Sequence, residues 1–251
     1  MPDLRAFDTP PRIEEPELID DATQPYADLR ASMMDVRRAN RLLGGTAVVT
    51  RQARQWLRRC RGATREQDVV TFLDVATGSA DIPEAVLRVA HREQVPVRIV
   101  GLDYSAPILR CAREQIGHEP RIRLLRGDAF RLPFASESFD YVLCSLAFHH
   151  FGPEGCVQAL QEIERVARHG WLVNDIRRAR SAWYLIRAIT WLFRMNRLTR
   201  HDGPASVLRA YSLPEYRRMV EAVHLRVGEE VELKGSLFYR VALIRNKSGR
   251  E

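Results

Sequence analysis

The sequence has few cysteines and no long hydrophobic run. Its four cysteines are scattered without a C-x-x-C pair, so their spacing indicates neither a disulfide framework nor a metal site. Arginine interrupts the longest apolar stretches before the ~18 to 20 residues that a bilayer span needs. No basic start followed by an apolar segment indicates a secretory signal. We therefore expect a cytoplasmic protein with free thiols, no bound metal and no transmembrane helix.

The positive charge also lacks a concentrated pattern. The formal net charge is +7 over 251 residues, and most of the excess is arginine spread along several segments. No compact Lys/Arg run is interleaved with aromatic residues, as it is in proteins that bind single strands. We expect a solvated basic surface and no nucleic-acid partner. An anionic membrane surface remains an alternative.

The chain begins with a proline-rich stretch. Residues 1–25 contain five prolines among acidic residues, which predicts a flexible leader rather than a domain. From Tyr26 to Arg61 the apolar positions recur with helical spacing, and Gly44-Gly45 interrupts them. Residues 26–66 are therefore predicted to hold two helices that cap the active site.

Strand and helix patterns then alternate, which is typical of βαβ units and a parallel sheet. The pattern predicts strands at 69–75, 97–103, 122–126, 139–146 and 171–175, and helices at 82–91, 106–116 and 153–167. Two alternating runs, 227–233 and 238–245, joined by Lys234-Gly235-Ser236, suggest an antiparallel pair that closes the sheet. The fold class is thus α/β: a Rossmann-like, doubly wound and mostly parallel seven-stranded sheet over residues 67–251.

Four strand ends carry groups that suit a nucleotide-like ligand, which open parallel sheets bind at the carboxyl ends of their strands. After the first strand, a loop of small residues from Asp74 to Asp81 allows close approach to the backbone and to a helix N-terminus. Asp103 ends the second strand, where a carboxylate can accept from both hydroxyls of a ribose. Asp128 and Ala129 follow the third strand and suit an adenine ring.

These motifs, as an ordered set, resemble class I S-adenosylmethionine (SAM) dependent methyltransferases. The resemblance covers roughly residues 30–245 and includes Asp-x-Ala-x-Gly-x-Ala-Asp, Gly-Asp-Ala and Ser138-Phe139-Asp140. Within that superfamily the chain is similar to the ubiquinone/menaquinone-biosynthesis type and to methyltransferases associated with type III polyketides. Two glycines of the usual loop are replaced here by Ala76 and Ala80.

The resemblance implies SAM as cofactor and a role for each matched position. Asp74, Ala76 and Gly78 would shape the methionine and ribose end, and Asp103 with the neighbouring Tyr104 would bind the ribose. Asp128 and Ala129 would flank adenine, and Ser145 would lie near the methionine tail. A solvated loop acid is the alternative for Asp103 and Asp128. A dehydrogenase is disfavoured, because only Gly78 remains of the G-x-G-x-x-G pattern.

Candidates for proton transfer follow the predicted strand at 139–146. His149 and His150 come directly after it, and a neutral imidazole within hydrogen-bond reach can accept a phenolic proton. Tyr211 is a further candidate for the acceptor side of the site. The alternative is that one or both histidines only cap the strand or pack under the cofactor.

A helix of unusual composition is predicted over about 180–194, within an expected helical lid insertion at about 176–223. Arg180, Arg187 and Arg194 recur every seven residues, and most of the other side chains are bulky and apolar. Three interpretations stay open: a core helix, a lid over an apolar acceptor pocket, and an interfacial helix on anionic lipid.

The resemblance to polyketide-associated enzymes implies a small apolar aromatic acceptor. We expect O-methylation of a phenol, resorcinol or quinol that bears an apolar chain. The alternatives are C-methylation of a quinone precursor, a nucleic-acid methyltransferase, and a SAM-binding partner subunit without catalysis. No Asn/Asp-Pro-Pro-Tyr/Phe tetrapeptide of amino-group methylating enzymes is present. The sequence does not indicate the oligomeric state.

Overall fold

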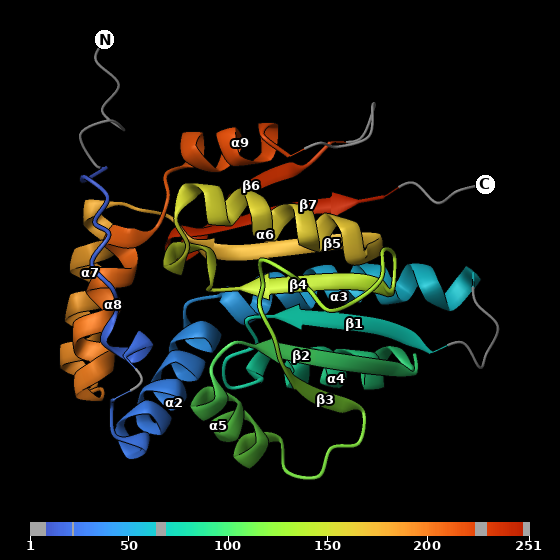
Figure 1. Ribbon diagram of the computed structural model, residues 1–251, viewed down its shortest axis with the longest axis horizontal. Coiled ribbons are helices and arrows are strands. Elements are labelled where there is room, and N and C mark those ends of the chain that lie inside the picture. Colours follow the sequence, from blue (N-terminus) through green and yellow to red (C-terminus); the bar gives the residue numbers. More distant parts are fainter. Residues whose placement is uncertain (1–8, 22, 64–68, 224–229, 248–251) are drawn as a thin grey trace.

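Seven strands form one sheet at the centre of the molecule (Figure 1). The computed structural model describes residues 9–21, 23–63, 69–223 and 230–247. The strand order is β3-β2-β1-β4-β5-β7-β6, in which β1 to β5 are parallel and β7 is antiparallel to both of its neighbours. The strands are β1 (Val70–Val75), β2 (Val97–Asp103), β3 (Ile122–Arg126), β4 (Phe139–Ser145), β5 (Ala167–Ile176), β6 (Glu232–Ser236) and β7 (Arg240–Asn246).

Helices cover both faces of the sheet, which confirms the predicted doubly wound α/β class. α3 (Gly45–Ala63) and α4 (Asp81–Glu93) bury their apolar stripes on one face, where Trp56 stacks on Tyr141 with 4.4 Å between ring centroids. α6 (Pro153–Val166) and α9 (Leu213–Glu221) cover the other face. α5 (Ala106–Ile116) packs beside β2 and β3. Across the described residues, every helix is too short or too polar to span a bilayer.

The remaining helices gather beyond the carboxyl ends of the parallel strands (Figure 1). They are α2 (Tyr26–Leu42), α7 (Arg180–Leu192) and α8 (Arg197–Arg209), with the short η1 (Leu18–Asp20) and η2 (Phe148–His150). Strand order reverses between β1 and β4, so the carboxyl ends of these two strands form the edge where open α/β sheets bind ligands.

The predicted closing hairpin is antiparallel, but its turn was misplaced. Gly235 pairs with Val241, so residues 234–236 lie inside β6. The reversal is made by η3 (Leu237–Tyr239), in which Phe238 and Tyr239 both have a φ of 58°. Residues 227–229 of the strand expected at 227–233 lie outside the described residues, and β6 begins only at Glu232. β5 is longer than expected, because it begins at Ala167, directly after α6.

Gly203 and Pro204 are typical of a turn, yet α8 continues through both residues. The side chain of Asn196 caps this helix by accepting from the amide of Leu198 at 2.8 Å. The Ser206 hydroxyl donates to the carbonyl of Asp202 at 2.9 Å within the same helix. Packing of α8 against α7 and α2 outweighs the backbone hydrogen bond that a proline inside a helix cannot make.

α7 ends earlier than expected and is not a core helix. It stops at Leu192, and Arg194 has a φ of 46° and lies beyond it, so only Arg180 and Arg187 share its cationic edge. Only Ala182 and Thr190 of this helix are buried. The core interpretation of the segment is therefore wrong.

Candidate functional site

A tight loop joins β1 to α4 at the reversal point of the sheet. Ala76, Gly78 and Ala80 adopt left-handed φ angles of 54°, 54° and 59°. A Cβ at Gly78 would meet nothing closer than 3.9 Å, so the backbone angle rather than space favours glycine there. The two alanines hold the glycine-like conformation, which costs ~1 to 2 kcal/mol at each.

Asp103 fixes the position of this loop from the end of β2. Its Oδ2 accepts from the amide of Gly78 at 2.9 Å, and its Oδ1 accepts from the amide of Ser105 at 3.0 Å. Burial raises the pKa of the Asp103 carboxyl, although these amide donors oppose the shift. The carboxylate is thus held in one orientation beside the loop.

Asp74 is the penultimate residue of β1, and its carboxyl group is buried. Its Oδ2 accepts from the hydroxyl of Thr77 at 2.6 Å, whereas its Oδ1 has no hydrogen-bond partner within the described part of the chain. Burial raises the pKa of Asp74 to about 8. A cationic donor at this oxygen would satisfy the carboxylate and lower that pKa.

One cavity of about 780 Å³ opens at these strand ends. Its wall contains the cofactor positions predicted from the sequence and both histidines: Asp74, Ala76, Gly78, Asp103, Tyr104, Asp128, Ala129, Ser145, His149 and His150. Asp128 is exposed and accepts from the amide of Phe130 at 2.9 Å, and Tyr104 is 71% exposed. The Ser145 hydroxyl accepts from the side-chain amide of Asn174 at 2.7 Å.

Tyr211 is the one sequence-predicted site residue that the structure does not bring to this cavity. Its side chain is 1% exposed, and its hydroxyl donates to the carbonyl of Phe151 at 2.6 Å. Burial raises the pKa of Tyr211 further above its ordinary value. A buried phenol whose proton is already donated to a carbonyl is a packing residue, so we assign Tyr211 no catalytic role.

His149 forms a buried pair with Asp175 from the end of β5. Its Nδ1 lies 2.7 Å from Oδ1 of Asp175, and its backbone amide donates to Oδ2 of the same carboxylate at 3.2 Å. Burial works against the charged Asp175, but His149 outweighs it and lowers the Asp175 pKa. An ionised Asp175 accepts from Nδ1–H, which leaves the lone pair of a neutral His149 on Nε2.

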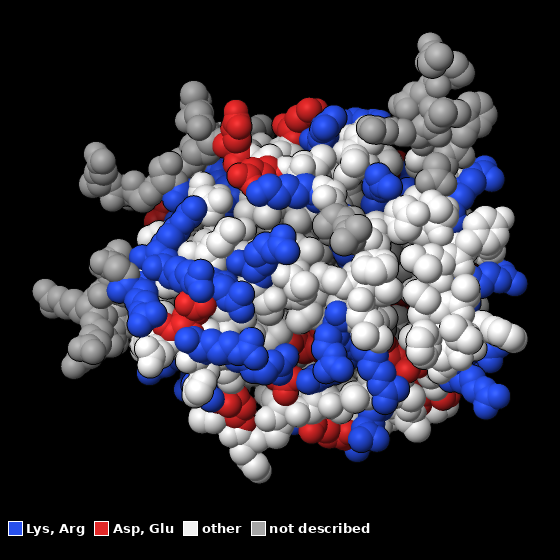
Figure 2. Space-filling model, turned by 180° about the vertical axis from the view of Figure 1, so that it is seen from behind, with Lys and Arg blue, Asp and Glu red and all other residues white. Residues whose placement is uncertain are grey.

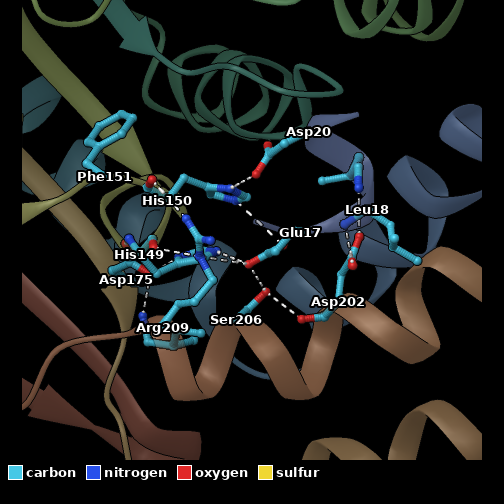
Figure 3. A network of polar contacts seen from close by, with 12 residues as sticks. Glu17, Leu18, Asp20, His149, His150, Phe151, Asp175, Asp202, Ser206 and Arg209 are labelled. Carbon is cyan, nitrogen blue, oxygen red and sulfur yellow. Dashed lines mark hydrogen bonds and ion pairs between the residues drawn. The ribbon is translucent and has the colours of Figure 1, made fainter. Parts of the chain in front are cut away.

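His150 lies between two acids from the N-terminal segment (Figure 3). Its Nδ1 is 3.2 Å from Oδ2 of Asp20, and its Nε2 is 3.8 Å from Oε2 of Glu17. Burial alone would lower the pKa of His150, but Glu17 and Asp20 raise it to about 9. His150 is therefore a cation at neutral pH and a poor proton acceptor.

Arg209 ties the N-terminal segment to the two histidines (Figure 3). Its guanidinium donates to the carbonyls of His149 and His150 at 3.2 and 3.0 Å, and also to the carbonyl of Glu15. On the other side of the segment, the Asp202 carboxylate accepts from the amides of Leu18 and Ile19 at 2.8 and 3.0 Å. Glu17, Ile19 and Asp20, which lie in the stretch expected to be a flexible leader, thus form part of the cavity wall.

One group among the described residues has the composition of a metal site. Glu17, His149 and His150 place their potential ligand atoms within 4.8 Å of one another. However, Nε of Arg209 lies 3.9 Å from Oε1 of Glu17, and Glu17 already faces the cationic His150. These positive charges disfavour a divalent ion, so we interpret the group as a buried network of ion pairs.

The fold and this loop agree with comparisons to known proteins. Residues 72–170, from β1 to β5, match a family described as "Methyltransferase domain". The chain carries a class I methyltransferase domain. An S-adenosylmethionine-dependent methyltransferase from Aquifex aeolicus has the same fold, with a TM-score of 0.50 and 15% identity over 75% of this chain and 88% of that one.

Curated relatives of the methyltransferase domain are named for quinone substrates. A demethylmenaquinone methyltransferase of Staphylococcus haemolyticus is 37% identical over 40% of each chain. A demethylmenaquinone methyltransferase of Streptomyces griseus is 29% identical over 63% of this chain and 68% of its own length. The chain spans less than half the length of several relatives that it matches.

The cavity of the methyltransferase domain fits its cofactor, S-adenosylmethionine. The unpartnered Oδ1 of Asp74 suits the ammonium group of the methionine moiety, and Asp103 has the acceptor-only chemistry that ribose hydroxyls need. Lining residues such as Ala129 and Leu102 are apolar and suit an adenine ring.

Two acids of the site could not be recognised in the sequence. Glu17 is 4% exposed and Asp20 meets His150, yet both lie in a proline-rich acidic stretch with the composition of a solvated leader. Their histidine partner is 130 positions away from Asp20 in the chain, so no local pattern marks them. Met33 and Ser32 on α2 also line the cavity, and there the apolar helical stripe was the only indication.

Proposed function

We propose that the chain transfers a methyl group from S-adenosylmethionine to a hydroxylated aromatic acceptor of the quinol or phenol type. When bound, SAM supplies a methyl group activated by a sulfonium. The observation that carries the proposal is the buried His149–Asp175 pair, because His149 lines the same cavity as the SAM-binding loop. Names of the relatives support a quinol-type acceptor.

The proposed cofactor positions are those at the strand ends. Gly78, Ala76 and Asp74 would hold the methionine end, Asp103 and Tyr104 the ribose, and Asp128 with Ala129 the adenine. Ser145, already fixed by Asn174, would lie beside the methionine tail. These groups would hold the cofactor between the loop and the histidines, which line the same cavity.

His149 is the proposed base. A neutral His149 would take the acceptor's hydroxyl proton at Nε2, and the ionised Asp175 would stabilise the resulting imidazolium through Nδ1–H. The cationic His150 lies beside His149 in the cavity wall and would stabilise the phenolate that forms. Glu17 and Asp20 hold His150 in that charged form.

Once ionised, a quinol is nucleophilic at its oxygen and at the adjacent ring carbon. The expected O-methylation therefore has one competitor, methylation at carbon, which the quinone names of the relatives favour. The two products can be separated chemically. A quinol methylated at oxygen does not reoxidise to a quinone in air, whereas a ring-methylated quinol does.

The test is methyl transfer from labelled SAM to alkylated quinols and resorcinols by wild type, His149→Gln and a control, His91→Gln. His91 lies on α4 and is exposed. The His149 variant should lose ~10²-fold or more in kcat with unchanged SAM binding, as is typical when a general base is removed. Full turnover by His149→Gln, or no turnover of any aromatic hydroxyl by wild type, would reject the proposal.

A further inference from the structure

The outer face of α7 exposes an unusual number of large apolar side chains. Of the nine large hydrophobic side chains exposed in the described part of the chain, five lie between residues 184 and 193. Trp191 is 70% exposed, Leu192 68% and Phe193 63%. Clusters of this kind are rare on soluble monomers and indicate a contact surface.

The inner face of α7 packs against α8, so the outer face is not needed to hold the helix in place. Thr190 is buried, and Gly203 of α8 allows Thr190 and Ile186 to approach closely, since a Cβ there would lie 3.3 and 3.4 Å from their side-chain carbons. Ala182 and Leu185 line the acceptor cavity. Apart from Leu185, the exposed large apolar side chains of this segment contribute neither to the core nor to the cavity; they are Tyr184, Trp191, Leu192 and Phe193.

Cations border this apolar face. Arg180 and Arg187 lie along one edge of α7, and Arg187 stands over the ring of Trp183 at 5.1 Å. A groove between α7 and α8 is lined by Tyr184, Arg187, Ala188, Thr190, Trp191, Arg197, Arg200, His201 and Pro204. None of these lining residues is acidic. α7 lies at the left edge of the molecule in Figure 1, which is the right edge in the view from behind (Figure 2). There, a broad uncharged area is bordered by Lys and Arg.

We infer that the outer face of α7, with the turn that follows it, docks on an anionic lipid bilayer. Trp191, Leu192 and Phe193 would enter the interface between headgroups and acyl chains, and the arginines of the groove would meet lipid phosphates. This combination of aromatic side chains with flanking cations is what an interfacial helix requires. The inference extends the proposed function, because it names the surface from which an apolar acceptor could reach the cavity, but the docking does not depend on catalysis.

Other occupants fit this face less well. A second copy of the chain would bring the same cationic groove, whose lining contains no acid, so the arginines would find no opposite charge there. A nucleic acid would match the cations, but it would leave Leu192 and Phe193 without an apolar partner.

The experiment is sedimentation of the full-length protein with vesicles of phosphatidylcholine alone and of phosphatidylcholine with phosphatidylglycerol. Wild type should bind the anionic vesicles at least tenfold more strongly. The double variant Trp191→Ala/Phe193→Ala and the double variant Arg180→Gln/Arg187→Gln should each weaken that binding tenfold or more. Leu42→Ala, at an apolar side chain of α2 that is 64% exposed, is the matched control and should bind as wild type does.

Circular dichroism melting establishes that every variant is folded, and none of the substituted tryptophan or phenylalanine positions lines the acceptor cavity. Bromine-labelled lipid should quench the fluorescence of Trp191 in wild type. Several results would overturn the inference: no vesicle binding by wild type, equal binding by the α7 variants, or a dimer in light scattering that Trp191→Ala/Phe193→Ala abolishes. Vesicle binding without turnover of any phenol would reject the proposed function and leave the docking surface standing.

Discussion

Asp103 ends β2 and Asp128 follows the neighbouring β3, but the two acids lie in different surroundings. Asp103 is fixed by two amides and partly buried, whereas Asp128 is exposed and accepts from one amide in its own loop. Charge-assisted hydrogen bonds to a buried carboxylate contribute ~1.5 to 3 kcal/mol each. Asp103→Ala should therefore weaken SAM binding at least tenfold in calorimetry, and Asp128→Ala should weaken it less. The reverse order would contradict the ribose assignment of Asp103.

His150 should make the stability of the protein depend on pH. Its folded pKa of about 9 lies above the ordinary value of 6.5, so its stabilising contribution is complete below about pH 6.5 and is lost as the pH rises through 9. The groups that face it are Glu17, Asp20, Arg209 and Asp103. A tenfold change in proton affinity corresponds to ~1.4 kcal/mol, so the contribution of His150 to stability is a few kcal/mol at most.

Urea unfolding of wild type and His150→Gln between pH 6 and 10 measures this contribution. The difference in unfolding free energy should be largest at pH 6 and should shrink toward pH 10. A difference that stays constant over this range would mean that Glu17 and Asp20 do not hold a proton on His150.

Sequence reasoning located the residues that follow regular strands, because a buried strand and the loop after it are local features. Asp103, Gly78 and the two histidines were found in this way, and all of them line the cavity. Glu17 and Asp20 were not found, since their role depends on contacts with η2 that only the folded chain creates. The sequence pattern also could not show that the Tyr211 hydroxyl already donates to a backbone carbonyl.

The β1–α4 loop stores strain in its alanines. Ala76 has a φ of 54° and is only partly buried, so replacing it by glycine relieves the left-handed conformation and loses little packing. Removing the left-handed alanine stabilises the folded protein by ~1 to 2 kcal/mol. Glycine also increases the conformational entropy of the unfolded chain, but this stabilises the unfolded state by only ~0.4 to 1 kcal/mol. Ala76→Gly should thus raise the unfolding free energy by about 0.5 to 1 kcal/mol.

Thermal and urea unfolding check this prediction, with Ala85→Gly as the comparison. Ala85 lies in the regular part of α4, where glycine should destabilise the protein by ~1 kcal/mol. If both glycine variants are destabilised equally, the loop carries no conformational strain.

At the scale of elements, periodicity predicted the strands and helices better than their ends. The heptad spacing of arginines suggested a helix to residue 194. However, α7 ends at Leu192, and Arg194 adopts a left-handed backbone conformation beyond it. The turn residues Gly203 and Pro204 suggested a break in α8, yet the cap at Asn196 and packing on two helices maintain it. Such tertiary contacts are not visible in a local pattern.

The cavity is assembled from distant parts of the whole chain. The N-terminal segment, α2, the strand ends and the α7–α8 pair each contribute walls, and Arg12 links two of these parts by donating to the carbonyls of Arg209 and Phe151 at 2.7 and 3.1 Å. The alternating strand pattern indicated the parallel sheet, and the family resemblance implied where the ligand binds. The contribution of both segments 17–20 and 238–240 to the cavity wall came only from the structure.

The apolar wall of this cavity should select acceptors by the length of their alkyl chain. Ile19, Met33 and Val36 lie in one part of the wall, and Ile186 of α7 lies in another. Each CH₂ buried there contributes up to ~0.8 kcal/mol, so four added carbons could lower KM by about two orders of magnitude.

The measurement is KM for resorcinols and quinols with chains from methyl to pentadecyl, presented in neutral detergent without vesicles. Wild type should show KM falling with chain length, and Ile186→Ala should show a flatter dependence because it removes part of the wall. Trp191→Ala is the matched control on the opposite side of α7, and without a bilayer it should follow wild type, since Trp191 does not line the cavity. Equal KM for short and long chains in wild type would mean that the alkyl chain stays outside the cavity. A flattened dependence in Trp191→Ala but not in Ile186→Ala would place the chain on the outer face instead, because the two substitutions report on opposite sides of the same helix.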